Sequence, residues 1–140
     1  MERKRAATID PAKVWSLNYR LLMSVIATVT PNIAALGLET KELFLLVEVE
    51  AHPYPAELAA VLCMPKPTVT VYVKRLEAAG FLRREIDAAD LRRHRLVVTP
   101  TGRKAMSRGL ALLSDGFGAR LERLSAAERA ALQRLLEKLA

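Results

Sequence analysis

The chain has 140 residues, of which 51% are hydrophobic and 26% are charged, a composition typical of one ordinary globular domain. The single cysteine excludes a disulfide within the chain, and no apolar run approaches the roughly 18 residues that a membrane span needs. The basic start, Met1–Arg5, is followed by no apolar leader region. We therefore expect a cytoplasmic protein without a membrane partner.

Positive charge is concentrated in the middle of the chain. Twenty-two Lys and Arg residues against fifteen Asp and Glu residues give a net charge of +7. The segment from Lys66 to Lys104 holds ten basic and four acidic residues, and so carries six of these seven net charges. An excess gathered in one segment favours a polyanionic partner, such as nucleic acid.

The first predicted element is a long amphipathic helix. Asp10 and Pro11 form an N-cap followed by a first-turn proline, and apolar residues recur at three- and four-residue steps over 14–29. Thr30–Pro31 repeats the capping signal, which predicts a separate short turn of helix that ends at Gly37.

The middle of the chain predicts a helix-turn-helix. One helix is predicted to begin at Thr40 and a short one at Pro55. The segment 64–67 predicts a tight connection, because each of its two prolines disfavours helix in the residue before it. The next helix is predicted over 67–79, with Gly80 as its left-handed terminator. Two short helices joined by a tight turn are typical of a helix-turn-helix.

A β-hairpin is predicted to follow. The segments 81–86 and 95–98 have the residue types of short strands, and polar residues over 87–90 connect them. Basic side chains crowd the tip of this hairpin, which is therefore interpreted as the wing of a winged helix-turn-helix.

Two helices complete the chain. Thr99–Pro100 begins the first, for which we predict an apolar face built from Met106, Leu110, Leu113, Phe117, Leu121 and Leu124. Its glycines predict a bend near 114–118. The segment 125–128 is a capping box that begins the last helix.

The predicted fold is mainly α with a small β-hairpin wing, of the α+β class, in a single domain over 1–140. Residues 38–99 form a winged helix-turn-helix DNA-binding lobe. Residues 10–37 and 100–140 form a helical lobe built from both termini. The apolar surface of the two ends exceeds what the middle can cover, so we expect these ends to dimerise. An intramolecular cap on one globule is the alternative.

Catalytic and metal-binding patterns are not found in the sequence. The two histidines lack ligand partners at metal-binding spacing, and no phosphate-binding loop or nucleophile motif occurs. We therefore expect neither an enzyme nor a cofactor. Cys63 is interpreted as a buried apolar filler rather than a redox-sensing thiol, since no resolving cysteine exists.

The helix over 67–79 is predicted to bind DNA. A helical projection places four residues on its inner face, namely Val69, Tyr72, Val73 and Leu76. Its opposite face has the hydrogen-bond donors, cations and methyl groups that suit a major groove, although a plainly solvated surface is the alternative. The residues predicted to contact DNA are Lys66, Pro67, Thr68, Thr70, Val71, Lys74 and Arg75.

The wing is predicted to contact DNA through Asp90, Arg92, Arg93 and Arg95. An arginine at such a tip is attracted to the negative potential of a narrow minor groove. Asp90 either pairs with the guanidinium of Arg92 or serves as a turn former.

These stretches resemble the multiple-antibiotic-resistance regulator (MarR) family of winged helix-turn-helix transcription factors, from about Asp10 to Leu139. The most specific stretch is 90–102, which follows the wing pattern of Asp, a variable residue and Arg, then Thr and Gly. The stretches 59–82 and 124–129 resemble the recognition helix and the start of the final helix.

The resemblance implies a homodimer that binds palindromic promoter DNA, usually as a repressor released by small phenolic or lipophilic ligands. By position, Arg92 is implied as the minor-groove arginine, with Asp90 as its partner. Lys66, Thr68 and Thr70 are implied to lie in the major groove. Two departures are Pro65, in place of a Ser or Thr N-cap, and Val71, in place of a basic residue.

A ligand pocket is placed by analogy beside the dimer helices, where Trp15, Tyr19 and Met23 share one side of the first helix at four-residue steps. Plain core or dimer packing is the alternative for this stripe. We predict a homodimeric, sequence-specific regulator that binds a pseudo-palindromic duplex, a repressor released by a small-molecule effector. A winged-helix module that binds acidic proteins and a non-specific nucleic-acid-binding protein are the alternatives.

Overall fold

A computed structural model describes residues 8–140, so the basic start Met1–Arg5 lies outside the described residues. The observed fold is mainly helical with one antiparallel hairpin, as predicted. In chain order the elements are α1 (Pro11–Ala34), α2 (Thr40–Glu48), α3 (Pro55–Val61), α4 (Lys66–Ala78), β1 (Leu82–Ile86), β2 (His94–Val98), α5 (Pro100–Leu121) and α6 (Ala126–Leu139).

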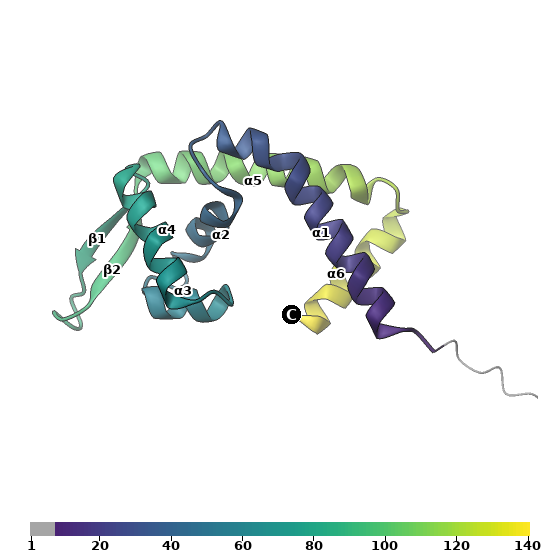
Figure 1. The fold of residues 1–140 in the computed structure, drawn as a ribbon, viewed down its shortest axis with the longest axis horizontal. Coiled ribbons are helices and arrows are strands. Elements are labelled where there is room, and N and C mark those ends of the chain that lie inside the picture. Colours follow the sequence, from purple (N-terminus) through teal and green to yellow (C-terminus); the bar gives the residue numbers. More distant parts are fainter. Residues whose placement is uncertain (1–7) are drawn as a thin grey trace, which may run out of the picture.

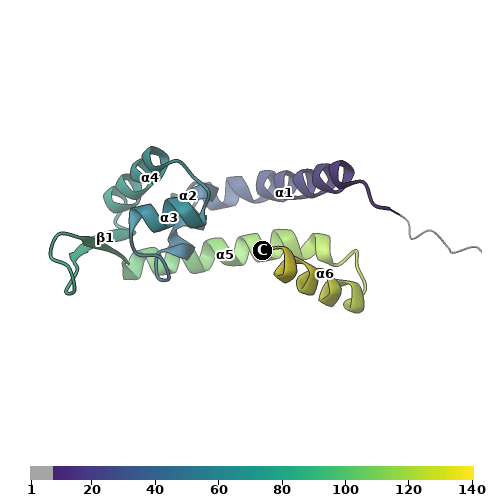
Figure 2. The ribbon, with the colours of Figure 1, turned by 90° about the horizontal axis from the view of Figure 1, so that it is seen from below.

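The elements are arranged along α5, which connects two ends of the molecule (Figure 1). The helices α2, α3 and α4 and the hairpin lie at the end where α5 begins, and α6 lies at the end where α5 finishes. Seen from below, α1 runs beside α5, and the hairpin projects beyond the start of α5 (Figure 2). Within residues 8–140, no helix is long and apolar enough to cross a membrane.

Helix α1 is longer than the sequence predicts. Asp10 caps it as expected, accepting a hydrogen bond from the Ala12 nitrogen at 3.0 Å. The predicted new helix at Thr30–Pro31 is wrong, because α1 continues through Pro31 to Ala34. The side chains of Val29 and Ile33 are 3% and 0% exposed. Their burial on both sides of Pro31 offsets the free energy that is lost because a proline cannot donate a backbone hydrogen bond.

The core is centred on α2, which lies between the other helices of the lobe. Leu43, Leu45 and Leu46 of α2 are fully buried. They belong to one apolar cluster that includes Ile33 of α1, residues of α3, α4 and the wing, and Ala105 of α5. The winged lobe and the ends of α1 and α5 therefore share a single core.

Helix α5 packs through small residues, which corrects one prediction. It is continuous from Pro100 to Leu121. A Cβ on Gly109 would lie 2.8 Å from a Leu43 methyl, and one on Gly116 would lie 2.5 Å from Val29. Gly109 and Gly116 thus allow close packing of α5 against α2 and α1. The buried face is rotated accordingly, and Leu110 is exposed.

We predict that Gly102→Ala destabilises the protein, whereas Gly118→Ala does not. A Cβ on Gly102 would run into the backbone of Phe81, where the start of α5 meets the residues that follow α4. We expect the free energy of unfolding to fall by about 1–3 kcal/mol. No atom lies within 4 Å of a Cβ on Gly118, so the control should gain up to about 1 kcal/mol of helix propensity. Denaturant unfolding at one protein concentration measures the free energy of unfolding of both variants. Equal changes in the two variants would contradict the close contact between Gly102 and Phe81.

Candidate nucleic-acid interface

The turn between α3 and α4 aims α4 outward from the lobe. Cys63 adopts a left-handed backbone with a φ of 52°, and the Met64 nitrogen donates to the Ala59 oxygen at 3.0 Å. Val69, Val73 and Leu76 anchor the inner face of α4 in the core, as predicted. Cys63 itself is exposed, so its interpretation as a buried filler is wrong, since the turn directs it away from the core.

The outer face of α4 holds most of the residues predicted to contact DNA. Lys66, Pro67, Thr70, Val71 and Lys74 are exposed, and Thr68 is half-buried. The Thr70 hydroxyl donates to the Lys66 carbonyl at 3.0 Å, which leaves its methyl group and oxygen lone pairs outward. Among residues 8–140, neither Lys66 nor Lys74 pairs with a carboxylate. Both charges therefore remain available to an outside anion.

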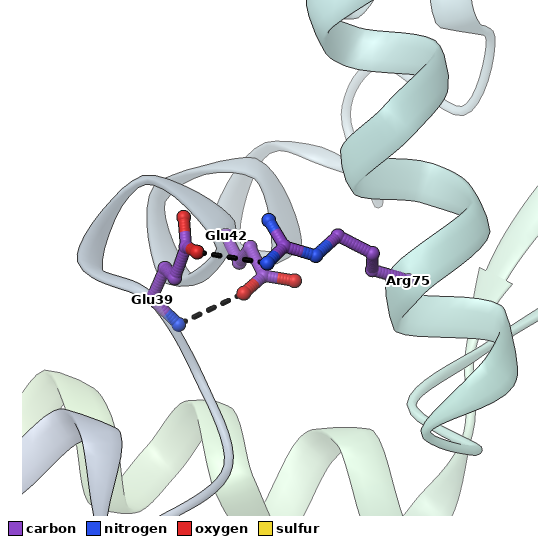
Figure 3. Close-up of polar contacts among 3 residues, drawn as sticks. All are labelled: Glu39, Glu42 and Arg75. Carbon is purple, nitrogen blue, oxygen red and sulfur yellow. Dashed lines mark hydrogen bonds and ion pairs between the residues drawn. The ribbon is translucent and has the colours of Figure 1, made fainter.

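Arg75 has a partner inside the protein that the helical projection does not predict. Its guanidinium lies 3.0 Å from the carboxylate of Glu39, the N-cap residue of α2. Glu42 in turn accepts a hydrogen bond from the Glu39 nitrogen at 2.9 Å, as Figure 3 shows. Arg75 thus links α4 to the start of α2. The ion pair directs the charge of Arg75 toward Glu39 of the same chain.

The wing is a regular hairpin attached to the lobe. Its strands pair from Leu82 opposite Val98 to Ile86 opposite His94. Leu82, Leu96 and Val98 point into the core, and the Leu96 nitrogen donates to the Pro53 oxygen at 2.8 Å. The residues 88–95 are exposed. The core therefore holds the base of the hairpin, and its tip projects from the protein.

Asp90 has the geometry of a turn former. One of its carboxylate oxygens accepts a hydrogen bond from the Arg92 backbone nitrogen at 3.0 Å, and its carbonyl accepts from the Arg93 nitrogen at 3.0 Å. No ion pair joins Asp90 to the guanidinium of Arg92 in the described part of the chain. Arg92 and Arg95 are exposed and likewise have no carboxylate partner there. Of the two roles that the sequence left open for Asp90, the structure shows the turn.

Arg93 and Tyr54 form a contact that the sequence analysis did not predict. The Arg93 guanidinium lies 3.6 Å from the centroid of the Tyr54 ring. The Tyr54 hydroxyl donates a hydrogen bond to the Asp87 carboxylate. This hydrogen bond is the main cause that lowers the pKa of Asp87 and raises the pKa of Tyr54. Tyr54 precedes α3 by one residue, and no local spacing signals that it contacts a hairpin over thirty residues away.

We predict that Tyr54→Phe raises the pKa of Asp87 toward its ordinary value of 3.8. The phenol stabilises the charged carboxylate, so its loss removes the main cause of the low pKa. Because the folded-state pKa is depressed, the stability that Asp87 contributes is present above the unfolded pKa and is lost as pH falls through the folded pKa. Carboxyl NMR titrations of both proteins measure the shift. An identical Asp87 pKa in the variant would show that the hydrogen bond is absent in solution.

The residues predicted to line a ligand pocket are exposed on the surface of the single chain. Trp15, Tyr19 and Met23 are 68%, 53% and 42% exposed on α1. An apolar cavity of about 220 Å³ lies instead between α1, α2 and α5. Its lining residues are Asn18, Leu21, Leu22, Val25, Ile26, Phe44, Leu113 and Phe117. The exposed stripe therefore does not pack in the core of its own chain.

Two comparisons identify related proteins. A family model described as the MarR family matches residues 36–93, from before α2 to the wing. A search of the curated proteins gives no match. The Mycobacterium tuberculosis MarR family protein Rv2887 is 26% identical in its complex with salicylic acid, with a TM-score of 0.76 over 96% of this chain and 100% of that chain. Its complex with DNA gives 25% identity and a TM-score of 0.76 over 95% and 99%.

Two more distant structures share the fold. A mutant of Escherichia coli MarR complexed with operator DNA is 21% identical, with a TM-score of 0.76 over 91% of this chain and 93% of that chain. CouR from Rhodococcus jostii bound to p-coumaroyl-CoA is 19% identical, with a TM-score of 0.78 over 90% of each chain. The outward helix and basic hairpin on a shared core define a winged helix-turn-helix protein. The MarR family model covers 36–93 of this protein, and nearly the whole chain shares its fold with the MarR family protein Rv2887.

Proposed function

We propose that two copies of this chain bind a pseudo-palindromic duplex and repress transcription until a small-molecule effector releases them. The observation that carries this proposal is a set of exposed cations on α4 and the wing that have no carboxylate partner within residues 8–140. Lys66 and Lys74 lie on α4, and Arg92 and Arg95 lie on the wing. Unpaired cations on a protruding helix and hairpin suit the phosphates and grooves of DNA. The contacts of Pro67, Thr68, Thr70 and Val71 with base edges belong to the same proposal.

The dimerisation surface is proposed over 10–37 and 100–140. Along α1, the exposed apolar side chains are Val14, Trp15, Leu17, Tyr19, Leu22 and Met23. Helix α6 has no buried residue, and Leu135, Leu136 and Leu139 are exposed. An apolar groove of about 680 Å³ lies between α5 and α6. Exposed apolar faces of this extent indicate that a second chain binds here and buries them. A two-fold dimer also places two recognition helices one DNA turn apart, about 34–36 Å.

The relatives support both ligand classes. Rv2887 is known in complex with DNA and with salicylic acid, and CouR with p-coumaroyl-CoA. In this chain, the cavity between α1, α2 and α5 is apolar and about 220 Å³ in volume, so it has room for one small aromatic molecule. The stripe of Trp15, Tyr19 and Met23 lies on the same helix, where a second chain would enclose it. We propose these surfaces as the place where an effector acts.

Selection of bound duplexes from a random pool tests the proposed function. A regulator is expected to select one sequence with two-fold symmetry and to prefer it over random duplex. Selection without sequence preference would support a non-specific nucleic-acid-binding protein. Failure to retain any duplex at low salt would support the alternative of a module that binds acidic proteins, and would overturn the proposal.

We predict that Arg92→Ala weakens binding mainly at sites with narrow A·T flanks. Each wing loses one contact, so the slope of log K against log salt should fall by about two per dimer. The matched control is Arg84→Ala, because the Arg84 guanidinium is already paired with Glu77 at 2.9 Å. Fluorescence titrations with the selected duplex at several salt concentrations compare the two. Equal slopes for wild type and Arg92→Ala would remove Arg92 from the interface.

We predict that Leu136→Glu converts the dimer into a folded monomer. Leu136 is 46% exposed in the single chain and lines the groove between α5 and α6. A carboxylate there costs little in the monomer but must be desolvated in an apolar interface. Val61→Glu introduces the same charge at a 42% exposed position on α3 and should remain dimeric. Light scattering after size exclusion measures the mass, and a dimeric Leu136→Glu protein would place the interface elsewhere.

A further inference from the structure

The wing is attached to the helix-turn-helix at two levels. Nearer its base, the Leu96 nitrogen donates to the Pro53 oxygen at 2.8 Å. Nearer its tip, Tyr54 contacts both sides of the hairpin, through the Asp87 carboxylate and the Arg93 guanidinium. We call Tyr54, Asp87 and Arg93 the wing clamp.

In the described part of the chain, the side chain of Tyr54 has no other polar role. Tyr54 is the N-cap residue of α3, but its side chain makes no capping hydrogen bond. Its hydroxyl instead reaches Asp87, and its ring lies beneath Arg93. A cation at 3.6 Å from a ring centroid is well within the distance at which the ring attracts it. Tyr54, the N-cap residue of α3, thus holds the hairpin.

Asp87 and Arg93 of the wing clamp lie at the two ends of the segment that forms the tip of the wing. The Asp87 nitrogen donates to the Arg93 oxygen at 3.0 Å, so these two residues face each other across the hairpin. Asp87 also accepts a hydrogen bond from the Ala89 nitrogen at 2.8 Å, and Asp90 accepts one from the Arg92 nitrogen at 3.0 Å. The tip that carries Arg92 is therefore an ordered turn mounted on the clamp.

We propose, building on the proposed function, that Tyr54 and Arg93 are positioning residues that set the angle of the wing and so direct Arg92 at the minor groove. In this arrangement the Arg93 guanidinium stays on the Tyr54 ring and does not bind a phosphate. The two neighbouring arginines of the wing thereby have different roles, one in attachment and one in contact with DNA.

The strength of the contact between Arg93 and the Tyr54 ring determines how much DNA affinity is lost when the contact is removed. An exposed cation–ring contact favours the attached conformation by about two- to fivefold. Loss of the contact lowers the population of correctly aimed wings by up to this factor, and the apparent affinity falls in proportion. With two wings in a dimer, the expected loss is about four- to twenty-five-fold. The number of phosphate contacts does not change, so the salt slope should remain that of the wild type.

The test uses Tyr54→Leu, which removes the ring and the hydroxyl but keeps an apolar side chain, and Tyr54→Phe, which keeps the ring. Without DNA, proton NMR should show the Arg93 side chain shifted upfield by the ring in wild type and in Tyr54→Phe, but not in Tyr54→Leu. With the selected duplex, Tyr54→Leu should bind about four- to twenty-five-fold more weakly. Its salt slope should be unchanged, and its preference for A·T flanks should be reduced. Tyr54→Phe should retain most of the affinity.

The combined variant Tyr54→Leu with Arg93→Ala distinguishes one shared contact from two separate ones. It should lose no more affinity than Tyr54→Leu alone, since that variant already removes the contact between the ring and Arg93. Additive losses, wild-type binding by Tyr54→Leu, or a reduced salt slope in that variant would each overturn the inference. A wild-type protein that selects no duplex would overturn the proposed function and the inference with it. Normal wild-type selection with an unaltered Tyr54→Leu variant would overturn the inference alone.

Discussion

The burial of three leucines of α2 is the constraint on which the rest of the structure depends. Leu43, Leu45 and Leu46 have no exposed surface, although they point to different sides of one short helix. Such a helix needs neighbours on more than one side, and α1, α5, α3 and α4 supply them. Truncation of any one of these leucines to alanine is expected to cost about 2–5 kcal/mol. Because α2 contacts both the long helices and the recognition helix, it fixes the angle between the two lobes.

The close approach of the long helices follows from the same constraint. Gly109 lets α5 lie against Leu43, and Gly116 lets it lie against Val29. Neither position has room for a Cβ without a shift of its neighbour. The ion pair between Arg75 and Glu39 then joins α4 to the N-cap residue of α2. Packed contacts and one ion pair therefore connect α1 with the recognition helix.

The basic residues of the winged lobe separate into two groups. Arg75, Arg83, Arg84 and Arg103 each lie beside a glutamate of the same chain, and Arg93 lies on a tyrosine ring. Exposed ion pairs of this kind contribute little to stability, but they set the direction of each side chain. Within residues 8–140, Lys66 and Lys74 of α4 and Arg92 and Arg95 of the wing have no such partner. These four charges therefore remain available on the surface proposed for DNA.

Local signals in the sequence predicted the winged lobe well, whereas contacts between distant residues could not be read from it. Gly80 ends α4 with a φ of 78°, and Ser125 with Glu128 forms the predicted capping box, because both depend on neighbouring residues alone. Pro31 misled the prediction, since burial of Val29 and Ile33 outweighs the local preference of a proline. The partners of Arg75 and Arg93 lie more than thirty residues away, so no spacing reveals them.

The salt dependence of binding to the selected duplex tests the central claim most directly. The claim is that unpaired cations on α4 and the wings of two chains neutralise the phosphates of one double helix. A dimer with about 6–10 phosphate contacts should lose roughly 10³–10⁵ in affinity between 50 and 200 mM salt, with a linear plot of log K against log salt. An affinity that barely changes over this range would show that these cations do not meet phosphates, and would contradict the account.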